Sequence, residues 1–176
     1  KVLKDHPRFS WEAVVDPSGE ALDVAKEKWN IPVLASSVDE LVECFQPEVA
    51  VIATPPNQRM NIIDRFLDLK AVFVEKPLGL TFAESQNFVR TCRKKGVLIQ
   101  VNFWRRGDEF FRKLASGVLK EYIRRPLAVF GIYGNGLLNN GSHMIDFTRM
   151  LFGEIESAEL FSSETSFVEG PIPGDK

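Results

Sequence analysis

Residues 71–101 read AVFVEKPLGLTFAESQNFVRTCRKKGVLIQV, and they contain the pattern that decides the fold. Two short apolar runs, at 71–74 and 97–101, enclose a segment in which Phe88 and Cys92 have helical spacing. Neither run alternates polar with apolar residues, which is typical of strands covered on both faces of a parallel sheet. The stretch therefore predicts a strand, a crossover helix and a second strand parallel to the first.

The same alternation of apolar runs and helical stripes continues toward the start of the chain, at residues 13–15, 21–29, 41–45, 49–53 and 62–67. Two expected helices begin with the spacing of a capping box, Ser37 with Glu40 and Thr81 with Glu84. Because crossovers between parallel strands are right-handed, this order predicts an open, doubly wound α/β sheet of the Rossmann type over residues 1–102.

The pattern changes after the last of these runs. We expect helices at 107–119 and 142–151, a strand at 127–133, a turn-rich stretch at 134–141 and one or two strands within 155–167. A domain boundary is therefore predicted near Asn102. The second part, residues 103–176, is small for a core of its own, and we interpret it as the start of a second α/β domain.

The composition excludes several classes of protein. Hydrophobic residues make up 44% and charged residues 26%, which is typical of a globular protein and not of a disordered chain or a coiled coil. The net charge of −2 offers no strongly basic surface, so we expect no nucleic-acid partner. No apolar run approaches the roughly 18–20 residues of a membrane span. The two histidines and two cysteines are far apart and give no metal-ligand spacing.

Cys44 and Cys92 each lie within an apolar helical stripe. With so few cysteines we expect reduced core residues of a cytoplasmic protein, and a disulfide between them is the less favoured alternative. No signal peptide is visible, because charged residues interrupt the first dozen positions. Since the chain starts at Lys1 and not at Met, we expect it to be part of a longer protein.

Ligands of open α/β sheets bind beyond the carboxyl ends of the strands. Asp16 directly follows the run at 13–15, and an acidic residue about 20 residues after a Gly-rich turn accepts hydrogen bonds from the adenosine ribose. That turn would lie before Lys1. A carboxylate at the ribose disfavours a 2′-phosphate, so this interpretation favours NAD over NADP. The alternative is a turn or helix cap, since residues 16–19 read Asp-Pro-Ser-Gly.

The other predicted strands also end in polar segments, which contain Thr54, Pro55, Pro56, Asn57, Glu75, Lys76, Pro77 and Asn102. Lys76 is the most informative of these residues. Pro77 restricts its backbone, and a partly desolvated lysine can serve as acid, base or hydrogen-bond donor to a substrate oxygen. The alternative is a solvated lysine that pairs with Glu75.

His143 lies at the start of the helix expected at 142–151, after a turn rich in Gly and Asn. A helix N-terminus favours the neutral imidazole, which suits a general base. Asp146 shares a helix face with His143 and could orient its ring. The alternative is a capping or packing histidine.

Trp104, Arg105 and Arg106 follow directly after the predicted domain boundary. Arginine suits a phosphate or a carboxylate and tryptophan suits stacking, so these residues are candidates for substrate contacts. The alternative is a solvated charge pair that opens the next helix.

Together these residues resemble the Gfo/Idh/MocA family of dinucleotide-dependent oxidoreductases, which includes glucose–fructose oxidoreductase and inositol dehydrogenase. The most specific match is Glu-Lys-Pro at 75–77, and Ala-Thr-Pro-Pro-Asn at 53–57 resembles the family's loop near the nicotinamide. The resemblance covers nearly the whole chain, and its other segments are 14–17, 102–106, 141–146 and 151–153.

The resemblance implies a Rossmann domain followed by an α/β domain with a mostly antiparallel sheet, which often serves for homo-oligomerisation. It implies that NAD, and less so NADP, is bound by Asp16, Thr54, Pro55, Asn57, Glu75, Lys76, Pro77 and Asn102. It implies that a sugar, polyol or sugar-nucleotide substrate is bound by Trp104, Arg105, Arg106, Asn140 and Asp146. The Lys76–Pro77 peptide is expected to be cis, as it often is in relatives.

In this family the lysine of Glu-Lys-Pro binds the reacting oxygen and the helix histidine acts as acid and base, which implies these roles for Lys76 and His143. Asn139 stands where the family often has Asp, and it can hold a hydroxyl group but cannot take a proton. We therefore predict an NAD-dependent oxidoreductase of secondary alcohols with Lys76, His143 and Asn139 as catalytic residues. A non-catalytic dinucleotide sensor of the same fold and a reductase of a non-sugar substrate stay open as alternatives.

Overall fold

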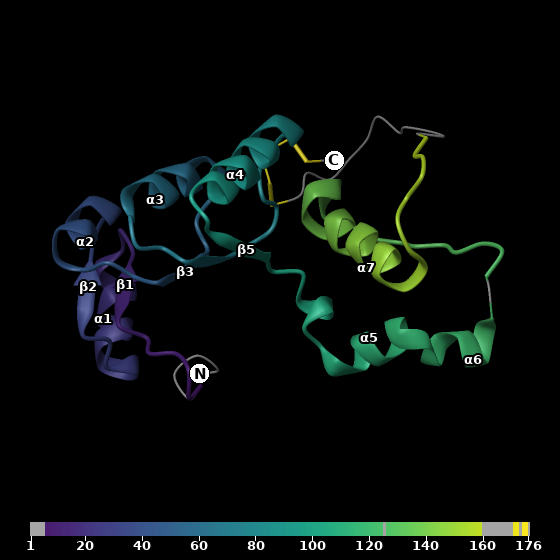
Figure 1. Ribbon diagram of the computed structural model, residues 1–176, viewed down its shortest axis with the longest axis horizontal. Helices are drawn as coiled ribbons and strands as arrows, with labels where there is room; N and C mark the ends of the chain where they lie inside the picture. The colour runs from purple at the N-terminus through teal and green to yellow at the C-terminus, as the bar shows by residue number, and fades with distance from the viewer. Residues whose placement is uncertain (1–5, 125, 160–170, 173, 176) are drawn as a thin grey trace. The chain divides into compact units, whose positions relative to one another are not determined.

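The computed structural model describes residues 6–124, 126–159, 171–172 and 174–175, and the chain divides into two compact units (Figure 1). The first unit comprises Lys1–Phe73 and Gln86–Gln100, and the second comprises Val74–Ser85 and Val101–Lys176. The chain leaves the first unit for the last time after Gln100.

Strands and helices alternate through the first hundred residues, as the sequence predicts. They are β1 (Ala13–Val15), α1 (Gly19–Trp29), β2 (Val33–Ala35), α2 (Val38–Cys44), β3 (Val49–Ile52), α3 (Arg59–Arg65), β4 (Ala71–Val74), α4 (Phe82–Lys94) and β5 (Leu98–Val101). The sequence analysis missed β2, because its apolar run is too short to stand out between two helical stripes.

The strands form two sheets. β1 and β2 pair in parallel with Ala13 opposite Val33, whereas β3, β4 and β5 lie in this order in a sheet of their own. The main-chain N–H of Leu98 donates to the carbonyl of Lys70 at 2.9 Å, and further along both strands the N–H of Asn102 donates to the carbonyl of Val74 at 2.8 Å. Both pairings advance in the same direction, so β4 and β5 are parallel. The parallel strands confirm the predicted Rossmann-type architecture.

Both predicted capping boxes hold a helix start. The Ser37 hydroxyl accepts the N–H of Glu40 at 3.2 Å, and the Glu40 carboxylate accepts the N–H of Ser36 at 2.7 Å. Thr81 and Glu84 repeat this arrangement at the start of α4. In both cases the carboxylate accepts the N–H of the residue before the cap, and the cap hydroxyl satisfies one free N–H group of the first turn.

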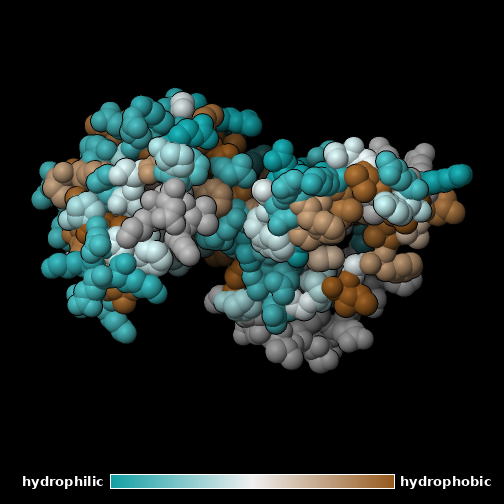
Figure 2. All heavy atoms as spheres, turned by 90° about the horizontal axis from the view of Figure 1, so that it is seen from below, coloured by the Kyte–Doolittle hydropathy of each residue, from teal (hydrophilic) through white to brown (hydrophobic). Residues whose placement is uncertain are grey.

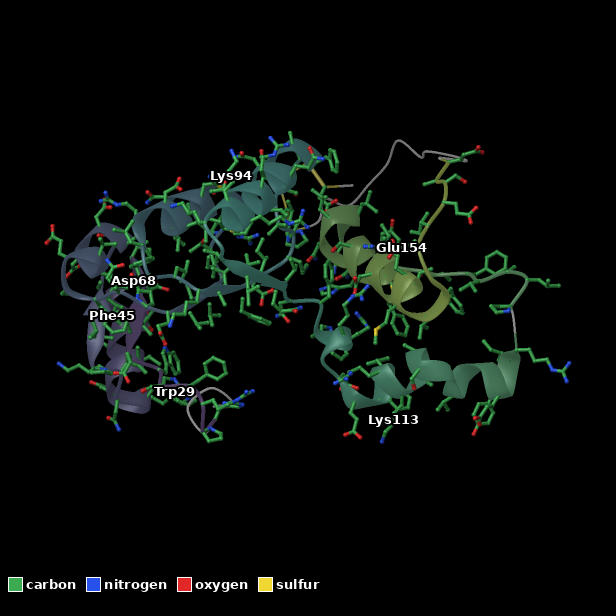
Figure 3. The ribbon with its side chains drawn as sticks, in the orientation of Figure 1. Trp29, Phe45, Asp68, Lys94, Lys113 and Glu154 are labelled. Atoms are coloured by element: carbon green, nitrogen blue, oxygen red, sulfur yellow. The ribbon has the colours of Figure 1, made fainter. Side chains whose placement is uncertain are left out.

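The core of the first unit lies between its helices and the β3–β4–β5 sheet. Apolar side chains from β3, α3, β4 and α4 are buried there: Ile52, Ile63, Val72, Phe88 and Cys92. Lys95, which follows α4, donates to the carbonyl of Ile63 at 2.9 Å and pairs with Asp64 at 3.1 Å, which ties α4 to α3. At the end of α1, the Trp29 ring packs at 5.9 Å from that of Trp11 (Figure 3).

The two cysteines have different surroundings. Cys92 is buried, as predicted, and both thiols are free. The prediction that Cys44 lies in the core is wrong: Cys44 is exposed, because α2 ends at this residue and the chain continues in an extended conformation at Phe45.

After β5, the regular secondary structure in the described part of the second unit is helical. After a 3-10 turn at Trp104–Arg106 it contains α5 (Glu109–Lys113), a π-helical turn at Leu114–Val118, α6 (Leu119–Ile123), a second π-helical turn at Gly136–Gly141 and α7 (Ser142–Phe152). The helix expected at 142–151 is confirmed as α7. The helix expected at 107–119 is broken, because Gly117 has a φ of 129°, which no regular helix allows.

The strand expected at 127–133 is wrong. These residues are irregular, and Leu127, Phe130 and Ile132 are almost fully exposed. A strand needs a neighbour to pair with, and none of the described strands pairs with this segment. Figure 2 shows that apolar side chains, in brown, also reach the surface on the face drawn there.

The region expected to hold one or two strands, 155–167, is irregular up to residue 159, and the rest of it lies outside the described residues. Across the described ranges, every helix is too short or too polar to cross a membrane.

The core position of Ile63 predicts a large loss of stability on truncation. Ile63 is 0% exposed and Leu67, four residues later, is 85% exposed. In the full-length protein, Ile63→Ala should lower the free energy of unfolding by about 2–5 kcal/mol, because it leaves a cavity. Leu67→Ala should change it by less than about 0.5 kcal/mol. Urea unfolding followed by circular dichroism measures both, and equal losses would contradict the described core.

Candidate functional site

Lys76 and Asn139, both predicted to be catalytic, are in direct contact within the second unit. Lys76 lies in the segment after β4, is half-buried and precedes a cis peptide bond to Pro77, which confirms the expected isomer. Its ammonium group donates to the side-chain oxygen of Asn139 and, at 3.4 Å, to the main-chain carbonyl of the same residue. An ammonium group has three N–H donors, so this arrangement leaves one for a ligand.

Glu75 and Asn102 are held together where β4 and β5 end. The side-chain amide of Asn102 donates to the Glu75 carboxylate at 2.7 Å, and its main-chain N–H donates to Val74. These bonds fix the two residues directly before Lys76, Val74 and Glu75. Glu75 is therefore engaged with Asn102 and not, as the alternative interpretation had it, with Lys76.

His143 lies in the first turn of α7, as the sequence predicts. Its ring meets the edge of Phe103, with centroids 5.8 Å apart and planes at 89°. Partial burial lowers the pKa of His143, and the positive charges of Lys76 and Arg105 lower it further, against a smaller opposite effect of Asp146. The imidazole is therefore neutral at pH 7 and can accept a proton. Phe103 was missed by the sequence analysis, although it follows directly after Asn102.

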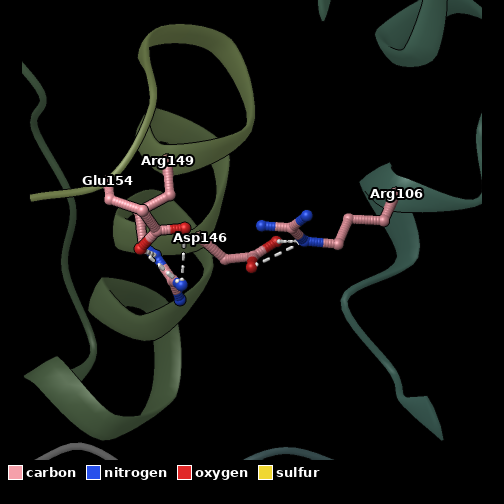
Figure 4. A network of polar contacts seen from close by, with 4 residues as sticks. All are labelled: Arg106, Asp146, Arg149 and Glu154. Atoms are coloured by element: carbon pink, nitrogen blue, oxygen red, sulfur yellow. Dashed lines mark hydrogen bonds and ion pairs between the residues drawn. The ribbon is translucent and has the colours of Figure 1, made fainter.

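Asp146 and Arg106, both predicted to contact substrate, bind each other (Figure 4). Asp146 is 6% exposed, and the Arg106 Nε donates to its two carboxylate oxygens at 2.8 and 2.9 Å. On the next turn of α7, Arg149 donates from two nitrogens, Nε at 2.8 Å and Nη2 at 2.9 Å, to the two carboxylate oxygens of Glu154 (Figure 4). The hydrogen bonds of Asp146 thus go to Arg106 and not to the His143 ring, and the role of both residues in binding substrate stays a prediction.

Arg105 is stacked on aromatic rings. Its guanidinium carbon lies 4.6 Å from the ring centre of Trp104 and 5.5 Å from that of Phe147. Cation–π attraction holds the group in place, and its charge acts on His143. The stacking that the sequence assigned to a substrate on Trp104 is made by Arg105 itself.

The turn Gly136–Gly141 carries Asn139 and Asn140, which are both half-buried. Ser142, the first residue of α7, donates its hydroxyl to the carbonyls of Leu138 and Asn139, each at 2.8 Å. Asp175, which was not singled out from the sequence, accepts the main-chain N–H groups of Leu138 and Asn139. Nothing local in the sequence signals this contact, because the partners are 36 residues or more apart.

The predicted cofactor residues of the first unit lie at strand ends. Asp16 follows β1, is half-buried, and accepts the N–H of Ser18 at 2.9 Å, so it forms a turn while Ser18 caps α1. Thr54 and Pro55 follow β3, and Asn57 lies exposed in a 3-10 turn at Pro56–Gln58.

Thr54 is the unusual member of this set. Its hydroxyl is buried and has no hydrogen-bond partner among the described residues, while its carbonyl accepts the Arg59 Nε at 3.0 Å. A buried hydroxyl without a partner is costly unless a ligand satisfies it. Together with an acidic acceptor at the end of β1, this unsatisfied hydroxyl fits the binding of a dinucleotide.

The comparison with known proteins agrees with this geometry. A model of the Gfo/Idh/MocA group, described as the oxidoreductase family with an NAD-binding Rossmann fold, matches residues 1–103. The chain belongs to this family. The predicted resemblance is thereby confirmed.

Individual members of the oxidoreductase family are also similar to this chain. Trans-1,2-dihydrobenzene-1,2-diol dehydrogenase from Homo sapiens is 33% identical over 172 residues, which cover 86% of this chain and 51% of the relative. Myo-inositol 2-dehydrogenase from Thermotoga maritima is 26% identical over 91% of this chain and 52% of its own length. The chain thus spans about half the length of the curated relatives it matches.

A solved structure of a putative oxidoreductase from Bacteroides fragilis is similar in fold to this chain. It is 30% identical, with a TM-score of 0.67, and the match covers 86% of this chain and 46% of that one.

The charge of Lys76 predicts a measurable change in the pKa of His143. In the full-length protein, Lys76→Met should raise this pKa toward the ordinary value of about 6.5, because the positive charge with the largest effect on it is gone. The imidazole signals in NMR spectra recorded over a range of pH report it. Lys113→Met, which removes an exposed charge that does not act on His143, is the control. A pKa that stays unchanged or falls in Lys76→Met contradicts this electrostatic account.

Proposed function

We propose that the full-length protein is an NAD-dependent dehydrogenase that oxidises a secondary alcohol on a ring bearing neighbouring hydroxyl groups. One observation carries the proposal: the Lys76 ammonium is held on Asn139, and the charge of Lys76 acts on a histidine whose lowered pKa keeps it ready to accept a proton. A fixed cation and a neutral base are the two groups that alcohol oxidation requires from a protein.

Lys76 donates a hydrogen bond to the oxygen of the alcohol in this proposal. With two N–H donors on Asn139, the remaining donor can meet a hydroxyl group and stabilise the negative charge that develops there. Because Asn139 and the bracing pair Glu75 and Asn102 hold the segment, this donor is in place before the substrate arrives.

His143 accepts the proton of the hydroxyl group in this proposal. Oxidation of an alcohol to a ketone removes that proton and a hydride from the same carbon atom. NAD, when bound, supplies the acceptor for the hydride. His143 takes the proton on its neutral imidazole, and the lowered pKa lets it do so at neutral pH.

Asn139 fills the position at which the family often has Asp. Its side-chain oxygen accepts a hydrogen bond from the Lys76 ammonium, as an aspartate oxygen would. Unlike an aspartate, however, an amide cannot take the proton of the substrate. We infer that proton transfer rests on His143 and that Asn139 orients the lysine.

The names of the relatives support the substrate class. A dihydrobenzene-1,2-diol and myo-inositol are both six-membered carbon rings with adjacent hydroxyl groups, and dehydrogenases of both are similar to this chain. A neighbouring hydroxyl offers a second hydrogen-bonding group of the substrate to the half-buried polar side chains of this unit. Homo-oligomerisation and a cytoplasmic location stay predictions.

Substitution of the two central residues tests the mechanism. With NAD⁺ and a panel of cyclic diols, inositols, free sugars and UDP-sugars, NADH absorbance should show turnover with the cyclic polyols. His143→Ala should lower kcat by about 10²–10⁴-fold and Lys76→Ala by about 10²–10³-fold. For the unsubstituted protein, kcat/KM should fall only at a pH below the ordinary histidine pKa of about 6.5, because the pKa of His143 is lowered and the imidazole stays unprotonated above that pH.

Lys113→Ala, on an exposed ion pair of α5, should keep normal turnover. Turnover that survives both Lys76→Ala and His143→Ala would exclude the mechanism. NAD binding without turnover of any alcohol would instead identify the sensor or the non-sugar reductase as the correct alternative.

Asp16 predicts the choice between the two dinucleotides. Asp16→Asn keeps the side-chain oxygen that accepts the N–H of Ser18 but removes the charge that opposes a 2′-phosphate. The preference for NAD over NADP, as the ratio of kcat/KM values, should fall by at least about tenfold. Asp23→Asn, on the exposed side of α1, should leave the ratio unchanged. An unaltered ratio in Asp16→Asn would show that Asp16 only shapes the turn.

A further inference from the structure

Asp175 is a buried carboxylate that accepts two main-chain hydrogen bonds. It is 4% exposed, and its two oxygens accept the main-chain N–H groups of Leu138 at 2.8 Å and Asn139 at 2.9 Å. Burial of a charged group is costly unless hydrogen bonds replace its water. Here charge-assisted bonds from two successive N–H groups do so, one to each oxygen.

Gly136 makes room for this carboxylate. A Cβ atom at this position would collide with an Asp175 carboxylate oxygen, and the residue has a φ of 86°, which favours glycine. The turn Gly136–Gly141 is therefore closed around the carboxylate, and both the absence of a side chain and the backbone angle at Gly136 are needed for it.

The contact leads directly to the candidate site. Asn139 meets Asp175 with its main-chain N–H, and it meets Lys76 with its side-chain oxygen and its carbonyl. An anchored N–H fixes where the side chain of the same residue starts. On the other side of the turn, the Ser142 hydroxyl holds the carbonyls of Leu138 and Asn139. The turn is thus clamped from two directions, by its N–H groups and by its carbonyls.

We propose that Asp175 is a positioning residue for the reaction, which acts through the main chain of Leu138 and Asn139 to hold the asparagine against Lys76. The inference rests on the proposed function of Lys76 and Asn139. Asp175 does not touch the substrate in this account, and a shift of Asn139 by a fraction of an ångström is enough to misdirect the free donor of Lys76.

The first test is the turnover of the full-length protein with Asp175→Ala. We expect kcat to fall by about 10-fold to 100-fold while the affinity for NAD stays normal, because positioning groups behind a reacting residue have effects of this size. The matched control is Asp108→Ala. Asp108 also accepts two successive N–H groups, those of Phe110 at 2.9 Å and Phe111 at 3.3 Å, at the start of α5. Asp108→Ala should leave kcat within about twofold of normal.

The second test measures how well Asp175 holds the main chain of the turn Gly136–Gly141 in place. Hydrogen exchange measured by mass spectrometry should be faster at residues 138 and 139 in Asp175→Ala and unchanged in the later turns of α7. Asp175→Asn keeps one oxygen acceptor for the N–H groups and should recover part of the turnover. Gly136→Ala, whose added methyl group collides with the carboxylate, should reproduce the loss while Asp175 is intact. If Asp175→Ala does not fold, Asp175→Asn and Gly136→Ala decide the question.

The outcomes separate this inference from the proposed function. Normal turnover in Lys76→Ala refutes the proposed function itself. Low turnover in Lys76→Ala together with normal turnover in Asp175→Ala refutes the positioning role alone, and so does an equal loss in Asp108→Ala and Asp175→Ala. A selective loss in Asp175→Ala and Gly136→Ala, with faster exchange at 138 and 139, supports it.

Discussion

The hydrogen bonds from the Lys76 ammonium to Asn139 connect segments that are 63 residues apart, and the candidate site depends on them. One segment leaves a parallel strand and the other is a turn that leads into α7. Each is braced separately, the first by Glu75 with Asn102 and the second by Ser142. The braces hold each segment, and the Lys76–Asn139 contact joins the lysine directly to the turn that leads into the helix that carries His143.

The charges of the second unit are arranged so that positive charge remains at the histidine. Asp146 is neutralised by Arg106, and Glu154 by Arg149. Lys76 and Arg105 are held by an amide oxygen and by aromatic rings, neither of which carries a negative charge. Their effects on the pKa of His143 add to that of burial and exceed the opposite effects of Asp146 and Glu75. The same lysine that can stabilise a developing oxyanion therefore also helps to keep the base unprotonated.

Much of this arrangement could be predicted from local sequence. Contiguous apolar runs and capping residues identify β1, β3, β4, β5 and the helices between them, because strand burial and helix caps are local properties. Lys76 and His143 were found for a related reason, since each stands at the end of a strand or the start of a helix.

The features that the sequence did not reveal are those that depend on distant partners. The apolar run at 127–133 resembles a strand, but pairing requires a neighbour that sequence pattern cannot supply. Packing between segments far apart decides three such features. They are the contacts of Asp175, the unsatisfied Thr54 hydroxyl, and the pairing of Asp146 with Arg106 in place of His143. Cys44 lies in an apolar stripe, yet α2 ends there and leaves it outside the core.

The contrast between the two thiols makes the first unit suitable for labelling. Burial raises the pKa of the Cys92 thiol, so it is both inaccessible and protonated in the folded chain, whereas Cys44 is exposed on α2. Of the two cysteines in this sequence, a maleimide or spin label added to the folded chain therefore attaches at Cys44 without any substitution. Delayed reaction at Cys92 then reports the opening of the layer between α3, α4 and the sheet, and its rate gives the free energy of that opening.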